Sequence, residues 1–365
     1  MPSATPAPPP PPSIPGLTTS QLSSFRDNGY LVLENYLSES EVTALLTTTN
    51  TLLSGFPLDT HPLTRFTTGT STTSDTEANA KHIGDTYFLT SGHKIHFFFE
   101  PDAFLPPSQS STSPPTLKAP KHLSINKIGH ALHALSPPFT ATTTPPHPTG
   151  TRNAAIARDL GFRDPRVLQS MVICKQPGIG AAVPPHQDSE FLYTDPPSAV
   201  GWWIALQDAG GKNGGLGFWR GSHKRGFVRR RFVRCEGEGG EAGTEFVEWK
   251  GRGLARELVD GEEAGEDEPY TPREEDFEIL DVKAGSLVLI HGNVLHKSER
   301  NTSGKSRFAY TFHVIEGAEG WGYDGRNWLQ PPEGGDGFTR LFGWEYCGEN
   351  GENGDAREGG RRGGE

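Results

Sequence analysis

Short apolar runs separated by turn-forming residues dominate the second half of the chain. Clusters of Gly, Pro, Asn and Asp divide these runs, which occupy residues 167–175, 199–207, 216–219, 277–282, 286–290 and 307–315. Many short runs divided by turns are typical of antiparallel strands in a sandwich or barrel. The hydrophobic pattern therefore predicts a mainly β core.

The first part of the chain has the spacing of short helices. In segment 19–29, Leu22 and Phe25 form an apolar stripe, and Thr19 or Ser20 is a candidate N-cap. A short strand is predicted at 30–33. Further helices are predicted at 38–53, with Ser38 or Ser40 as its N-cap, and at 127–135 and 152–160. These helices are expected to flank the β core.

Several segments lack the apolar residues that a core needs. Residues 1–16 form a Pro-rich arm, and residues 348–365 form a tail of mostly Gly, Glu, Asp, Asn and Arg. Both are predicted to be disordered. One domain is expected over 17–332, with solvated low-complexity insertions at 105–121, 140–151 and 235–276.

The negative charge of the chain is concentrated in one segment. The formal net charge is −11, and segment 235–276 alone holds fifteen acids against Lys250, Arg252, Arg256 and Arg273. This segment therefore accounts for the whole net charge, and the remainder is close to neutral. Neither nucleic acid nor an anionic membrane is an expected partner. No run of 18 apolar residues occurs, so no membrane span is expected.

The cysteines and the chain ends favour a cytoplasmic location. Cys174, Cys235 and Cys347 are far apart, which argues against a disulfide framework and against a thiolate zinc site. The first residues lack the basic and apolar regions of a secretory signal. The final Gly363-Gly364-Glu365 is not a peroxisomal S-K-L signal.

The first candidate for metal chemistry is the pair His186 and Asp188. On an extended strand side chains alternate, so these two residues project from the same side and could share one ion. A His-x-acid pair arises often by chance, so the pair needs a third ligand from another part of the chain.

His296 is the preferred third ligand. It follows the predicted strand 286–290, and loop ends on a rigid scaffold are places where functional residues collect. His291, five residues earlier, is the competing candidate. Two histidines and one carboxylate form the facial triad of non-haem Fe(II) sites, which leaves positions open for a co-substrate and O₂.

Arg307 supports this interpretation. In the predicted strand 307–315, alternation places Arg307, Ala309 and Thr311 on one face and large aromatic residues on the other. A buried guanidinium needs an anionic partner. A dicarboxylate that chelates the metal at one end would need a bidentate cation at its other end, and arginine supplies that geometry.

At this point an ordered set of motifs resembles the phytanoyl-CoA dioxygenase family over roughly residues 20–332. The motifs are Lys94-Ile-His-Phe-Phe-Phe-Glu100, Ser124-Ile-Asn-Lys-Ile-Gly-His-Ala-Leu-His133, Val167-Leu-Gln-Ser-Met171, Pro185-His-Gln-Asp188, Trp203-Ile-Ala, Asn213-Gly214, Gly221-Ser-His223, His296-Lys-Ser298, Arg307-Phe-Ala-Tyr-Thr-Phe-His313 and Asn327-Trp-Leu-Gln330. The resemblance implies a double-stranded β-helix (jelly-roll, cupin-like) core that binds Fe(II) and 2-oxoglutarate.

The resemblance also implies roles for individual residues. His186, Asp188 and His296 match the iron ligands. Positions that contact 2-oxoglutarate match Lys94, Met171, Trp203, Ser298 and Arg307, with Arg307 on the distal carboxylate. The resemblance implies structural roles for His130 and His133; by our own interpretation His223 caps its turn and His313 packs in its strand. One departure is Arg220, which replaces the usual Pro of a turn. Asp188 is retained, which argues against halogenation.

We therefore expect an Fe(II)- and 2-oxoglutarate-dependent dioxygenase that uses O₂ to hydroxylate a C–H bond of a small organic substrate, releasing succinate and CO₂. One alternative is a hydrolase with Zn²⁺ and an activated water on the same triad. Arg307 has no explanation in that alternative. Another is a non-catalytic jelly-roll binding module that interacts through the acidic insertion.

Overall fold

The computed structural model describes residues 14–66, 82–83, 86–106, 115–225, 228, 230–237, 239–248, 272–332 and 334–342. The predicted tail and all but three residues of the predicted arm lie outside these ranges. No helix within these ranges is long and apolar enough to cross a membrane.

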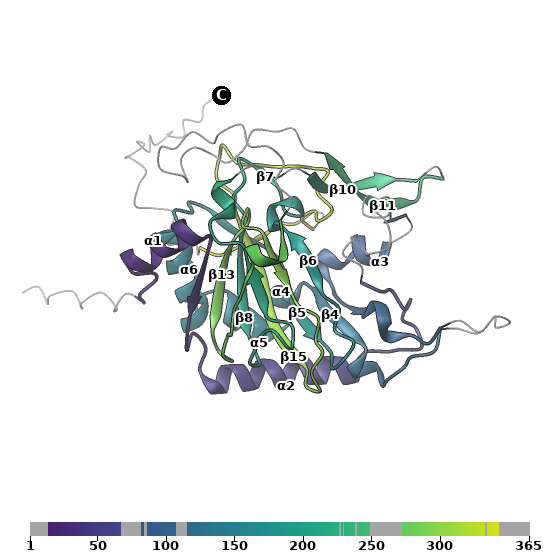
Figure 1. Ribbon diagram of the computed structural model, residues 1–365. Helices are drawn as coiled ribbons and strands as arrows, with labels where there is room; N and C mark the ends of the chain where they lie inside the picture. The colour runs from purple at the N-terminus through teal and green to yellow at the C-terminus, as the bar shows by residue number, and fades with distance from the viewer. Residues whose placement is uncertain are drawn as a thin grey trace, which may run out of the picture.

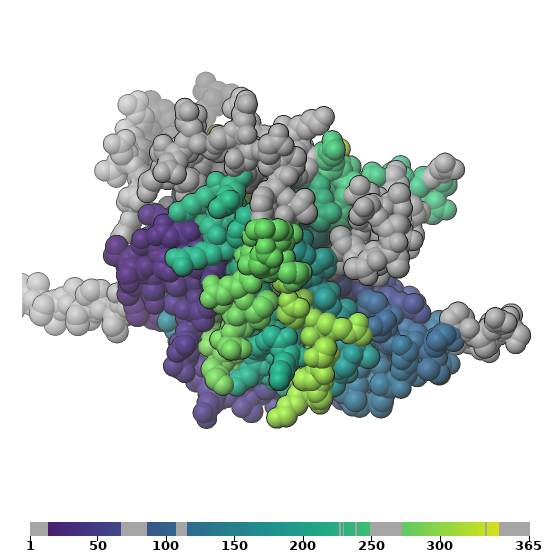
Figure 2. Space-filling model, in the orientation of Figure 1, coloured from purple at the N-terminus to yellow at the C-terminus, as the bar shows by residue number. Residues whose placement is uncertain are grey.

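A large antiparallel sheet forms the centre of the molecule (Figure 1). Its main path in spatial order is β1 (Tyr30–Leu33), β13 (Leu287–His291), β8 (Val200–Ala205), β15 (Arg307–Glu316), β5 (Pro165–Lys175), β4 (Ile125–His130) and β3 (Ile95–Phe99), and β17 (Thr339–Arg340) also pairs with β5. Strand β1, near the start of the chain, pairs with β13 from its second half. Figure 2 shows purple N-terminal residues next to green residues from this later part.

A smaller sheet supplies the second layer. It consists of β12 (Glu278–Ile279), β9 (Leu216–Phe218), β14 (His296–Ser298) and β6 (Val183–His186), all antiparallel. Two antiparallel sheets with their inner faces together are the layers of a jelly roll. The predicted mainly β, double-stranded β-helix class is confirmed.

Short sheets and turns complete the β structure. A hairpin of β10 (Arg230–Glu236) and β11 (Ala242–Glu248) pairs with β2 (His82–Ile83), and β7 (Thr194–Asp195) pairs with β16 (Gly322–Tyr323). Single turns of helix are η1 (Ser91–His93), η2 (Pro101–Ala103), η3 (Lys121–Leu123), η4 (Asp188–Glu190), η5 (Ser222–Lys224) and η7 (Glu274–Asp276).

Helices cover the outer face of the large sheet. They are α1 (Thr19–Asn28), α2 (Glu39–Gly55), α4 (Leu132–Leu135), α5 (Pro137–Thr143) and α6 (Pro148–Asp159). The short α3 (Thr86–Leu89) packs instead beside β11, and its Phe88 lines the cavity described below. The main hydrophobic core lies between the covering helices and the sheet, and it includes Leu45, Phe139, Trp202 and Tyr310. Alternation along β15 puts Tyr310 in this core and Arg307 on the opposite, inner face.

Both long N-terminal helices begin with a capping box. Ser38 caps α2, with Glu41 bonding back to its backbone, as the sequence predicted for Ser38. In α1 the N-cap is Thr18, whose side chain accepts a hydrogen bond from Gln21 N–H. The prediction of Thr19 or Ser20 was therefore wrong by one or two positions.

The predicted helix 127–135 is wrong over its first half. Residues 125–130 form β4, which lies between β3 and β5, and only 132–135 are helical. Ile125 and Ile128 are both fully buried, and burial in the middle of a sheet outweighs the local helical spacing.

Segment 140–151 is also not the solvated insertion that its composition predicted. It contains the end of α5 and the start of α6, and Thr142 and Thr143 are buried. Each of their hydroxyls donates to the carbonyl four residues earlier, which satisfies the group inside the helix. Threonine-rich sequence is here compatible with burial.

The other two predicted insertions are described in part. Leu105 N donates to Thr116 O, while 107–114 lies outside the described residues. Within 235–276, strand β11 and turn η7 are ordered elements, and 249–271 lies outside the described residues. The proposed domain boundaries otherwise stay a prediction.

Candidate active site

Strand pairing brings two histidines together on the smaller sheet. His186 is the last residue of β6 and His296 is the first of β14, and they lie directly opposite each other in the antiparallel pair. Their ring centroids are 4.2 Å apart. Residues that are far apart in the sequence thus become cross-strand neighbours.

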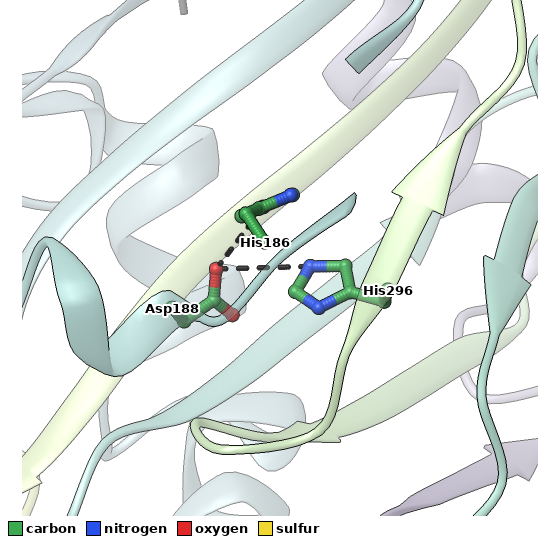
Figure 3. A group of neighbouring side chains, drawn as sticks. All are labelled: His186, Asp188 and His296. Carbon is green, nitrogen blue, oxygen red and sulfur yellow. Dashed lines mark ion pairs between the residues drawn. The ribbon is translucent and has the colours of Figure 1, made fainter. Parts of the chain in front are cut away.

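Asp188 completes the group. It is the first residue of η4, two positions after His186, and its Oδ1 lies 3.7 Å from Nε2 of both His186 and His296 (Figure 3). One donor atom from each side chain falls within 4.8 Å of the others. These three residues are the metal-binding candidate that the described part of the chain offers.

His291 does not join this group. Its Nδ1 accepts a hydrogen bond from Asn293 N, and its ring lies 4.8 Å from that of His223. Neither histidine belongs to the three-residue group. The structure favours His296 over His291 as the third member.

The hydrogen bonds of the two histidines direct their Nε2 atoms toward the shared centre. Nδ1 of His186 donates to Pro184 O at 2.9 Å, and Nδ1 of His296 donates to Val294 O at 3.1 Å. Since a carbonyl only accepts, Nε2 keeps the free lone pair in the neutral ring. This is the tautomer that a metal ligand needs.

Burial and charge set the protonation of the group. Burial, together with His296, lowers the pKa of His186 to about 3, so its ring is neutral near pH 7. Burial alone would raise the pKa of Asp188, but His296 and His313 hold it below its usual value. Asp188 is therefore a carboxylate beside the neutral His186 ring.

The three residues open into a cavity of about 190 Å³ between the two sheets. Among the described residues of its walls, Asp188 supplies the one carboxylate, against several cationic side chains. Those cations are Arg65, Lys127, Arg230, Lys297 and Arg307. The cavity therefore favours anionic ligands.

Arg307 is one of the most completely buried residues of the cavity wall, with 1% of its surface exposed. Its Nη2 donates to Gly214 O at 2.8 Å, whereas Nε and Nη1 have no hydrogen-bond partner. Burial lowers its pKa to about 10, which still leaves it charged at pH 7. Nη2 carries a second hydrogen beyond the one given to Gly214 O, and this hydrogen beside a free Nε–H or Nη1–H forms the fork that matches a carboxylate.

Three of the residues implied by the resemblance lie in the same cavity wall as Arg307. They are Met171 of β5, Trp203 of β8 and Ser298 of β14. The Arg307 guanidinium carbon lies 5.3 Å from the Trp203 ring.

Lys94 is the exception. It follows η1 and its side chain is exposed, outside the residues that line the cavity. Its carbonyl accepts hydrogen bonds from His130 N and Ala131 N, which anchors the backbone and leaves the side chain outside. The structure therefore contradicts the expected position of Lys94.

Lys127, together with Lys297, lines the cavity instead. Its Nζ lies 3.2 Å from the centre of the Phe66 ring, and it stands opposite Ile173 in the β4–β5 pair. Burial lowers its pKa to about 7. The sequence did not predict Lys127 as a cavity residue because segment 127–135 was predicted as a helix. The alternation of side chains along a strand would have indicated its position.

His313 was also missed as a cavity residue. It lies on the same face of β15 as Arg307, and its Nε2 is 3.3 Å from Asp188 Oδ2. Alternation from Arg307 extends to position 313, so the signal was present in the sequence.

The remaining motif histidines have local partners. His130 and His133 pair with the hydroxyls of Ser91 and Ser170, and His223 Nε2 donates to Arg26 O. None of them belongs to the three-residue group.

The turn containing Arg220 forms without the usual Pro. Gly221 adopts φ +75°, and its N–H donates to Asn28 O. Arg220 Nε donates to Asn28 Oδ1 at 2.6 Å, so the arginine itself ties the turn to the end of α1.

The outer part of the cavity has aromatic walls. They come from α3, β3, η4, β10 and nearby loops, and comprise Phe66, Phe88, Phe98, Phe191, Phe232 and Trp328. Arg230 of β10 donates to Glu190 Oε2 at 3.0 Å, which ties the β10–β11 hairpin to the turn that follows Asp188.

Comparisons with known proteins agree with this geometry. The family model described as phytanoyl-CoA dioxygenase (PhyH) matches residues 25–309. Phytanoyl-CoA dioxygenase of Arabidopsis thaliana is 41% identical over 315 residues, which cover 86% of this chain and 94% of that protein. Phytanoyl-CoA dioxygenase domain-containing protein 1 of Bos taurus is 42% identical over 317 residues, which cover 86% and 95%.

A solved structure supports the fold. The epimerase SnoN, in complex with Fe³⁺, alpha ketoglutarate and nogalamycin RO, superposes with a TM-score of 0.52 at 15% identity, over 88% of this chain and 98% of SnoN. The family match and the relatives at about 40% identity carry the assignment: the chain belongs to the phytanoyl-CoA dioxygenase family.

Proposed function

We propose that the protein is a non-haem Fe(II)- and 2-oxoglutarate-dependent oxygenase that hydroxylates a C–H bond of a small organic substrate. One observation carries the proposal: His186, Asp188 and His296 share a cavity with a buried arginine whose Nε and Nη1 lack partners. Two histidines and one carboxylate are the donor set of non-haem Fe(II) oxygenases.

The residues fit both groups. His186, Asp188 and His296 would hold the iron, and Arg307 would hold the distal carboxylate of 2-oxoglutarate, with Ser298 beside it. Met171 and Trp203 form the adjoining walls. A bound iron ion, 2-oxoglutarate and O₂ supply the oxidation, in which one oxygen atom enters the substrate and the other enters succinate as CO₂ leaves.

The chain itself orients these groups and limits access of water. The backbone carbonyls at Pro184 and Val294 fix the two imidazole rings, and Gly214 O fixes one edge of Arg307. Trp203, 3% exposed, closes the cavity on the Arg307 side. A preorganised, dry pocket lowers the cost of charge changes during reaction.

Lys127 takes the place that the resemblance suggested for Lys94. Its position on the cavity wall would give a second cation for a carboxylate of the co-substrate or the substrate. Because the described part of the cavity wall has one carboxylate against several cations, an anionic ligand meets little repulsion there.

The test is conversion of 2-oxoglutarate to succinate by the full chain with Fe(II) and O₂, with acyl-CoA thioesters and cell extract as substrate sources. We expect His186→Ala and Asp188→Ala to abolish conversion and Fe(II) binding. His291→Ala, which removes a histidine outside the group, is the control and should keep Fe(II) affinity. Full conversion by either triad variant would refute the proposal.

The metal content separates the competing hydrolase. Protein purified without oxygen should contain or accept Fe(II) and bind 2-oxoglutarate. A zinc-loaded protein without affinity for 2-oxoglutarate would favour hydrolysis, in which Arg307 has no evident use. No metal affinity at all would favour a binding module.

A further inference from the structure

His313 touches Asp188 from the side opposite the two candidate iron-binding histidines. Its Nε2 lies 3.3 Å from Asp188 Oδ2, while Asp188 Oδ1 faces His186 and His296. The two oxygens of one carboxylate thus have different partners. This division is the starting point for a role of His313.

A second contact of His313, with Gln169, fits a neutral ring that carries its hydrogen on Nε2. Gln169 Nε2 lies 3.3 Å from His313 Nδ1. An amide nitrogen only donates, so Nδ1 accepts and the hydrogen is on Nε2. The Nε2–H of His313 therefore faces Asp188 Oδ2 at an ion-pair distance of 3.3 Å, while Oδ2 accepts no hydrogen bond in this structure. If the Gln169 side-chain amide were turned around, its oxygen would accept from His313 Nδ1–H. A neutral His313 ring would then direct the lone pair of Nε2 at the Asp188 carboxylate, which is unfavourable.

The large sheet places the three groups by its register. Gln169 of β5 and Gly201 of β8 are the two direct neighbours of His313 on either side of β15. A Cβ at Gly201 would lie 3.2 Å from Asp188 Oδ2 and 3.5 Å from His313 Nε2. The missing side chain at Gly201 is what gives the carboxylate and the imidazole room to meet.

We propose that His313 is a positioning residue that holds Asp188 Oδ2, so that Asp188 offers only Oδ1 to the iron. This inference rests on the proposed function. A carboxylate held in this way would occupy one metal position. His186 and His296 would occupy two more, and the remaining positions would stay free for 2-oxoglutarate and O₂. Outer hydrogen-bond partners of ligands commonly tune metal sites in this way.

The test uses His313→Leu, which retains bulk and loses the donor, and His313→Gln, which retains an N–H. Loss of such a partner typically weakens metal affinity by about 10–100-fold, and we expect a rise of this size in the Fe(II) Kd of His313→Leu, measured by anaerobic calorimetry. We expect His313→Gln to restore part of the affinity. With Co(II) as a probe, the visible spectrum of His313→Leu should change because a second oxygen can coordinate.

His223→Leu is the matched control, since it removes another buried histidine that lies outside the cavity. Its Fe(II) Kd should stay that of the wild type. Gln169→Leu removes the contact that orients the His313 ring, and its Fe(II) affinity should fall by less than that of His313→Leu. This variant provides the test if His313→Leu does not fold.

An unchanged Fe(II) Kd and Co(II) spectrum in His313→Leu would overturn the inference and leave the proposed function standing. Failure of the wild type to bind Fe(II) would instead remove the proposed function on which it rests.

Discussion

Arg307 combines deep burial with free hydrogen-bonding capacity. Among the residues that the structure describes, Gly214 is its one hydrogen-bond partner, through Nη2, and no carboxylate pairs with it. A buried charge without an ionic partner is costly, and the cost is offset when an anion binds. This arrangement suits a ligand-binding role better than a structural ion pair.

We expect Arg307→Leu to weaken 2-oxoglutarate binding by roughly 30-fold, because hydrogen bonds to a charged group contribute about 1.5–3 kcal/mol. Arg307→Lys keeps the charge but loses the two-pronged geometry, so its loss should be intermediate. Calorimetry with the metal-loaded protein measures both. Lys305→Leu, which removes an exposed cation two residues away, should have no effect. Equal affinities of Arg307→Leu and wild type would exclude the assigned role.

Lys127 is a half-buried cation with a pKa of about 7, so its charge is lost as the pH rises through neutrality. An anion bound beside it would favour the charged form. Affinity for that anion should therefore be highest below pH 7 and decrease above it.

We expect the affinity for 2-oxoglutarate to fall by about tenfold between pH 6.5 and 8.5. Lys127→Met should bind more weakly at low pH and show a flatter profile, whereas Lys94→Met should behave like the wild type. Calorimetry across this pH range checks all three proteins. A loss in Lys94→Met with no change in Lys127→Met would restore the original sequence-based assignment.

Residue spacing was a good guide wherever the element type was right. The alternation along 307–315 placed Arg307 on the inner face. His186 also lies near Asp188 as expected, although Asp188 begins the turn η4 and is not on the extended strand that the spacing argument assumed. Lys127 was missed because its segment was assigned to a helix, for which facing positions differ. The error in the element thus became an error in the site.

Helix α5 shows how a threonine-rich segment can belong to the core. Thr143 is fully buried, and its hydroxyl is 2.6 Å from the hydroxyl of Tyr310 on β15. Composition alone predicted this segment to be solvated, because threonine is usually near the surface. Only the packing partner across the helix–sheet interface reveals its structural role.

We expect Thr143→Val to destabilise the protein by about 1–2 kcal/mol, because one buried hydrogen bond of Tyr310 is lost. Urea unfolding followed by circular dichroism gives this difference. Thr140→Val, on the same helix but only half-buried, should change the stability by less than about 0.5 kcal/mol. An unchanged free energy of unfolding in Thr143→Val would show that the contact with Tyr310 does not stabilise the fold.

The net charge of the whole chain and the charge of the cavity wall have opposite signs. The chain has 45 Asp and Glu residues, yet among the residues that the structure describes Asp188 is the one acid of the cavity lining. The net charge of −11 therefore says little about the ligand. The local pattern predicted the strands, but it could not predict their order, because pairings such as β1 with β13 join distant segments.

Strand β15 leaves almost no position free to vary. All ten of its residues are buried, and both edges of the strand are paired. One face holds Arg307, Thr311 and His313 in the cavity wall, and the other packs into the core. Adaptation to a new substrate within this architecture is therefore expected to proceed through the β10–β11 hairpin and the neighbouring loops, which can change without disturbing the central strand.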